Sequence, residues 1–315
     1  MRTGRILASA FLTVIVLAGQ VASLPSQSQG PQNVAVEMRN IYYHFTSRIA
    51  VHISQLDGEI VPSRENSIPI FDDPNSFYVA MRYAKISISS KVLSAVMNDH
   101  VFAGNDAPLK DLSVSIEAQR IKVKGKLHSK GDIPFETESS VSLTSQGKVR
   151  LHAEHIKAAH LPMKGLMELL GLHVSNLINT KKLSGVEAEG DDLILDPGQM
   201  FPPPQIRGKL SAIQIQGDEL VQVYGVPDKS GSFPPISGNY MAYRGNQLRF
   251  GKLTMSDSDM ILIDMDPKDP FDFYLDHYRE QLSAGDTKIT PQFGLRVYMR
   301  DFNKLQRSAA RHSGR

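Results

Sequence analysis

The chain has 315 residues, of which 41% are hydrophobic and 22% are charged. This composition is typical of a globular protein with one large domain or two modest ones. Lysine and arginine number 35 against 33 acidic residues, so no charge excess favours a nucleic-acid partner. Cysteine is absent, which excludes disulfides, thiolate metal sites and a cysteine nucleophile.

The first 23 residues predict an export signal. Arg2 and Arg5 form a positive start, residues 6–18 carry no charge, and small residues end the stretch at Ser23. We expect cleavage near Ser23, which would place the mature protein in the periplasm or outside the cell. The alternative is an uncleaved anchor, because the apolar stretch is close to the roughly 20 residues that span a bilayer. Residues 24–33 predict a flexible lead-in.

The next part of the chain predicts strands followed by a short helix. Apolar residues alternate over 49–53 and again over 77–88, which is the period of a strand. Asp57-Gly58 indicates a turn. Ser89 is a favourable N-cap, and apolar residues then recur at helical spacing towards Gly104.

The clearest pattern is an antiparallel meander over residues 111–157. Four runs of alternating apolar and polar residues are separated by turn signals at 119–120, 130–132 and 146–147. Each run therefore has one apolar and one polar face.

The register of this meander can be predicted from charge. When apolar residues face one another, Lys124 lies opposite Glu136 or Glu138, and Leu143 lies opposite Val149. Cross-strand pairs of opposite charge stabilise a sheet. The polar face is therefore consistent with a solvated outer surface.

A strongly apolar helix is predicted over residues 163–178, and such a helix must be largely buried. Strand patterns resume between 193 and 223. Proline, glycine and serine over 226–238 predict a linker. Beyond it, residues 239–305 form a smaller β-rich segment with a helical piece at 271–282, and residues 306–315 predict a disordered basic tail.

Several motifs carry a resemblance to a known family. They are Ile86-Ser87-Ile88-Ser89 before the short helix, Val123-Lys124-Gly125 at a strand end, Gly147-Lys148-Val149-Arg150-Leu151 followed by His160-Leu161-Pro162, and Leu193-Ile194-Leu195-Asp196-Pro197 followed by Ile206-Arg207-Gly208-Lys209-Leu210. Over residues 77–225 the chain resembles bacterial phospholipid-binding proteins of the tubular lipid-binding (TULIP) type, related to the lipomannan elongation factor family.

The resemblance implies an α+β, β-rich domain over residues 34–225. In that fold a long, curled antiparallel sheet wraps around an apolar helix and leaves a tunnel for acyl chains. The tunnel lining expected from it comprises Val92, Val96, Met97, Ile116, Val123, Phe135, Leu151, Leu166, Leu170, Val174 and Ile178. A plain packed core is the alternative for the same residues.

The function expected from this resemblance is non-catalytic holding or transfer of a phospholipid or other acyl lipid, with transient contact to a membrane surface. No metal or cofactor is expected: His152, His155 and His160 do not follow the zinc-protease order. One alternative is an envelope structural or interaction protein with a solid core and no ligand. Another is a lipid hydrolase whose triad is not recognisable from spacing.

Overall fold

The computed structural model describes residues 33–128, 132–159, 161–162, 173–177, 180–181, 183–227 and 233–306. The predicted signal, nearly all of the lead-in, and the tail beyond residue 306 lie outside these ranges. The predicted apolar helix at 163–178 also lies outside them, except for the single turn α3 (Val174–Leu177).

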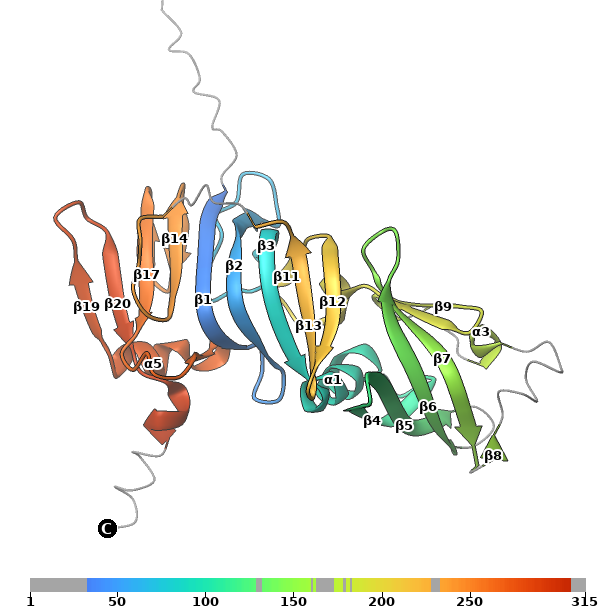
Figure 1. Ribbon diagram of the computed structural model, residues 1–315. Helices are drawn as coiled ribbons and strands as arrows, with labels where there is room; N and C mark the ends of the chain where they lie inside the picture. Colours follow the sequence, from blue (N-terminus) through green and yellow to red (C-terminus); the bar gives the residue numbers. More distant parts are fainter. Residues whose placement is uncertain are drawn as a thin grey trace, which may run out of the picture. The chain divides into compact units, whose positions relative to one another are not determined.

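A large, curled and open mixed sheet contains most of the described strands (Figure 1). Its order is β12-β13-β3-β2-β1-β14-β17-β20-β19, with β11 added parallel to β3 and β18 parallel to β1. In chain order the strands are β1 (Val34–His44), β2 (Ala50–Pro62), β3 (Phe77–Ser89), β11 (Gln205–Arg207), β12 (Leu210–Gln216), β13 (Glu219–Gly225), β14 (Tyr240–Gly245), β17 (Ser258–Asp264), β18 (Phe271–Tyr274), β19 (Asp286–Ile289) and β20 (Leu295–Met299).

A second sheet contains the predicted meander. Its order is β4-β5-β6-β7-β10-β9, with β8 paired to β7. The strands are β4 (Leu109–Glu117), β5 (Arg120–His128), β6 (Asp132–Leu143), β7 (Val149–Ala158), β8 (Leu161–Pro162), β9 (Val186–Glu189) and β10 (Asp192–Leu195). The predicted register is confirmed, because Lys124 pairs with Glu136 and Leu143 pairs with Val149.

The short helix after β3 is also confirmed. α1 (Ser90–Val96) begins at Ser89, whose hydroxyl accepts a hydrogen bond from the Val92 amide at 3.4 Å. A π-helical turn, η1 (Met97–Val101), continues it. Further short elements are α4 (Pro197–Met200), η2 (Leu275–His277), α5 (Tyr278–Ser283) and the hairpin of β15 (Leu248–Phe250) with β16 (Leu253–Met255).

The predicted turn at Asp57-Gly58 is wrong. Both residues lie inside β2, where the pairing with β3 shifts register between them. A Cβ at Gly58 would lie 2.4 Å from the carbonyl oxygen of Ala80, so only glycine fits there. The pair marks a β-bulge at which two backbones approach closely.

The β-rich segment at 239–305 continues the large sheet. β14 pairs antiparallel with β1, and residues 32–315 form one compact unit. The strands on either side of the predicted linker at 226–238, β13 and β14, therefore belong to the same sheet. The helical piece predicted at 271–282 begins only at Leu275, because Phe271–Tyr274 extend along β1 as β18.

Buried side chains of both sheets form a common hydrophobic cluster. Among the described residues, the apolar face of the large sheet is not wrapped around a helix. The segment Phe201–Ile206 lines that face instead, with Phe201, Pro204 and Ile206 directed to it. No helix in the described ranges has the length and apolar character needed to span a bilayer.

Candidate functional site

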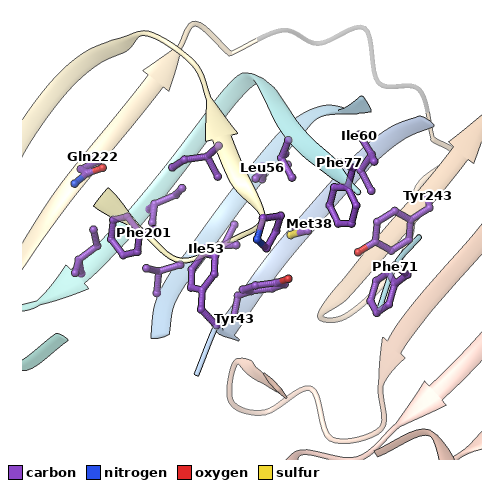
Figure 2. A pocket seen from close by; sticks show the side chains of 17 residues that line it. Met38, Tyr43, Ile53, Leu56, Ile60, Phe71, Phe77, Phe201, Gln222 and Tyr243 are labelled. Atoms are coloured by element: carbon purple, nitrogen blue, oxygen red, sulfur yellow. The ribbon is translucent and has the colours of Figure 1, made fainter. Parts of the chain in front are cut away.

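The first cavity lies on the apolar face of the large sheet and has a volume of about 50 Å³. Figure 2 shows Phe201 and Gln222 at one end of it and Tyr243 and Phe71 at the other. Its lining comprises Met38, Tyr43, Phe45, Val51, Ile53, Leu56, Ile60, Phe71, Phe77, Val79, Ile86, Ile88, Phe201, Pro204, Ile206, Gln222 and Tyr243.

Irregular pairing in the central strands shapes this cavity. Along β2 the buried residues change from Val51 and Ile53 to Leu56 and Ile60, across a register shift that follows Ile53. An extra residue changes which positions of a strand face the core and bends the strand locally. Both halves of β2 therefore present apolar side chains to the same cavity.

Aromatic rings close the first cavity at its ends. The rings of Phe45 and Phe201 lie 5.7 Å apart, and Phe71 meets Tyr243 edge-on at 5.7 Å. Edge-to-face contacts at such distances are favourable. Burial raises the pKa of Tyr43 and of Tyr243, so both phenols stay protonated at neutral pH.

The second cavity lies between α1, the meander sheet and α4, and has a volume of about 40 Å³. Its lining comprises Leu93, Val96, Met97, Val114, Ile121, Val123, Val149, Leu151, Leu195, Pro197, Met200, Phe201, Leu220 and Gln222. Gln222 is the one strongly polar side chain among these residues.

Two polar side chains hold α1 against the edge strand β4. The Ser94 hydroxyl accepts a hydrogen bond from the Val114 amide at 2.8 Å. Asn98 accepts one from the Leu112 amide at 2.8 Å and donates one to the Leu112 carbonyl at 2.6 Å. An edge strand has no neighbouring strand on one side, and these bonds satisfy backbone groups of β4 there. They also hold in place the helix that lines the second cavity.

The two cavities meet at Phe201 and Gln222, which line both of them. α4 ends at Met200, next to Phe201. Its start is fixed by Asp196, which accepts a hydrogen bond from the Gly198 amide at 3.0 Å. The Phe201 ring therefore projects into the junction from the residue that follows this helical turn.

Gln222 is a buried amide at this junction, with an exposed fraction of 4%. Its Oε1 accepts a hydrogen bond from the Tyr224 hydroxyl at 2.6 Å, while its Nε2 makes no hydrogen bond to any described residue. The apolar junction therefore contains one unused donor.

The predicted lining residues fall into three groups. Val96, Met97, Val123 and Leu151 line the second cavity. Val92, Ile116 and Phe135 are partly buried against the common core, and Val174 belongs to a small separate cluster with Ala153 and Ile156. Leu166, Leu170 and Ile178 lie outside the described residues.

The sequence interpretation missed the first cavity altogether. Its residues in β1 and β2 do not keep a single two-residue period, since Asn40 adopts a positive φ of 54° within β1 and β2 carries bulges. The sequence does carry a signal of this cavity. The buried residues of β2 occupy odd positions up to Ile53 and even positions from Leu56 onwards, a pattern that fits a strand with one inserted residue.

The described residues offer no recognisable metal site. Among them, no three histidine or acidic side chains gather to hold a metal ion. His152 and His155 are both exposed, because a register shift in the β6–β7 pairing places an extra residue between them. His152 pairs with Asp192 at 2.7 Å.

Comparisons with profiles of known protein families, with characterised proteins and with solved structures found no match for this chain.

Proposed function

We propose that this protein is an exported, non-catalytic lipid-binding protein that holds or transfers a phospholipid or other acyl lipid. The observation that carries the proposal is the pair of apolar cavities joined at Phe201, whose described linings contain no acidic or basic side chain. Hydrocarbon is the chemistry that such a lining recognises. Each buried methylene contributes about 0.8 kcal/mol.

The cavity volumes restrict the shape of the ligand. A water-sized group needs roughly 10–15 Å³, so 50 Å³ holds about four such groups in a row. A short polymethylene segment fits this volume. A complete acyl chain requires both cavities and some widening, which the unbranched side chains of Met38, Met97 and Met200 permit.

Native mass spectrometry combined with lipid extraction tests the proposal. The protein is expressed with its leader, so that it meets envelope lipids, and is purified without detergent. We expect a bound acyl lipid on the wild type. Val51→Phe fills the first cavity and Val114→Phe fills the second, so each should lower lipid occupancy at least several-fold.

Val226→Phe is the matched control, because it makes the same change at a side chain that is 76% exposed. It should leave lipid occupancy unchanged. Circular dichroism checks that all three variants are folded. A wild-type protein that carries no lipid and takes none up on titration would overturn the proposal in favour of an envelope interaction protein with a solid core.

A further inference from the structure

Gln222 occupies the point where the two apolar cavities meet. On β13, Leu220, Gln222 and Tyr224 are all buried and share one face by strand alternation. Across the strand pair, Gln222 lies opposite Ile86, which lines the first cavity, while Leu220 lines the second. One amide is thus flanked by hydrocarbon on both sides.

The neighbouring tyrosine determines which end of the amide is free. Burial raises the pKa of Tyr224, so its phenol keeps its proton and donates it to Oε1 of Gln222. With the amide reversed, Nε2 would donate to the phenol oxygen, and the phenol proton would then lack an acceptor. The free end is therefore the NH₂ group, a hydrogen-bond donor.

We propose that Gln222 selects the ligand by donating a hydrogen bond from Nε2 to an ester carbonyl oxygen. This inference rests on the proposed lipid-binding function. The ester would lie at the junction, with its acyl arm in one cavity and the rest of its apolar body in the other. The recognised class is then an acyl ester, such as a diacyl lipid.

The lining disfavours the two nearest alternatives. A free fatty acid would bring a carboxylate into a space whose described lining has no cationic side chain, and an unpaired buried charge is costly. A plain hydrocarbon would leave Nε2 without an acceptor. An ester carbonyl supplies an acceptor without charge, between two apolar arms.

A competition between two lipids tests this selection. A diacyl phosphatidylglycerol and its dialkyl ether analogue, equal in headgroup and chain length, are offered together, and bound species are counted by native mass spectrometry. The wild type should prefer the ester about three- to tenfold, the usual effect of one hydrogen bond. Gln222→Met keeps the side-chain length and should bind both lipids equally.

A second measurement covers the case in which Gln222→Met does not fold. Tyr224→Phe removes the bond that orients the amide, so it should reduce the ester preference. The carbonyl stretch of a ¹³C-labelled ester should lie at lower frequency in wild type than in Tyr224→Phe. Equal binding of both lipids by the wild type would overturn the selection while leaving the lipid-binding function intact. Binding of neither lipid would overturn both.

Discussion

The meander sheet and the large sheet differ in how regularly their strands pair. In the meander, β5 pairs with β6 without a register shift, the β4–β5 and β6–β7 pairings each shift once, and oppositely charged pairs such as Lys124 and Glu136 lie on the outer surface. In the large sheet, β1, β2 and β3 carry irregular positions, and the first cavity forms along them.

Regular pairing makes the register of a hairpin predictable from its sequence, whereas the register shifts between β2 and β3 bring apolar residues of both parities to one face. A bulge rotates side chains and bends a strand. The same irregularities require glycine wherever two backbones come too close for a side chain. Changing those glycines should therefore destabilise the large sheet.

The largest effect is expected for Gly225→Ala in β13. Gly225 has φ of +61°, and an added Cβ would lie 1.8 Å from the carbonyl oxygen of Arg82. A left-handed backbone costs a side-chain-bearing residue about 1–2 kcal/mol, and the clash adds to it. The free energy of unfolding, measured by urea titration, should fall by about 3 kcal/mol or more.

Gly217→Ala is the matched control for this substitution. Gly217 has a similar φ of +62°, but nothing lies within 4 Å of the added Cβ. The loss there should be limited to the backbone cost of about 1–2 kcal/mol. Equal losses of unfolding free energy at both positions would show that the close approach of Gly225 to the Arg82 carbonyl contributes nothing.

The pairing of the meander strands could largely be predicted, whereas the first cavity could not. Repeated alternation and charge pairing determined the register of Lys124 and Leu143, because a slip by one residue would expose the whole apolar face. In the large sheet, Gly58 looked like a turn because a turn and a bulge both use glycine. The pairing of β14 with β1, more than 200 positions apart in sequence, left no local pattern.

Four of the fourteen residues that line the second cavity could be predicted, and for the same reason. Val96, Met97, Val123 and Leu151 lie in elements with a clear period. Phe201 and Gln222 follow no such pattern, although they connect the cavities. A lone glutamine in a strand resembles any solvated polar residue until its neighbours are known.

A smaller loss is expected where α1 contacts the meander. Asn98→Ala would leave the amide and the carbonyl of Leu112 without their partners on the edge strand β4. We expect the free energy of unfolding to fall by about 1–3 kcal/mol. Hydrogen exchange at the Leu112 amide should also become faster.

The adjacent Asp99 provides the control. Its carboxylate makes an exposed ion pair with Arg48 at 3.0 Å, and such pairs contribute roughly 0–1 kcal/mol. Asp99→Ala should therefore leave the Leu112 amide protected. If both variants exchanged Leu112 equally fast, the hydrogen bonds of Asn98 would not be what anchors the helix.

Two carboxyl groups, one in each sheet, should also respond oppositely to pH. Burial raises the pKa of Asp264 in β17 above its ordinary value of 3.8, with Asp301 adding to the rise. Its contribution to stability is present below pH 3.8 and is lost as the pH rises through the folded pKa. In the meander, the hydrogen bond from Arg120 lowers the pKa of Glu154, so that contribution is present above pH 4.5 and is lost on acidification.

Carboxyl ¹³C titration of the folded protein measures both groups in one experiment. The Asp264 resonance should shift at a pH above 3.8 and that of Glu154 below 4.5. Arg120→Gln should raise the midpoint of Glu154 and leave Asp264 unchanged. A common midpoint for the two groups would contradict the opposite pKa shifts expected for Asp264 and Glu154.

The smallest effect is expected on the outer face of the meander. Lys124→Glu places two carboxylates opposite each other at Glu136, where the wild-type charges lie 3.7 Å apart. Like charges in directly opposed positions destabilise a pair by less than about 1 kcal/mol at a solvated surface. The double variant Lys124→Glu with Glu136→Lys should recover most of that loss, because the pair is reversed rather than removed. High salt should shrink the difference between the variants, since screening acts on exposed charges. A loss well above 1 kcal/mol that salt does not reduce would mean that this face of the meander is covered in solution rather than solvated.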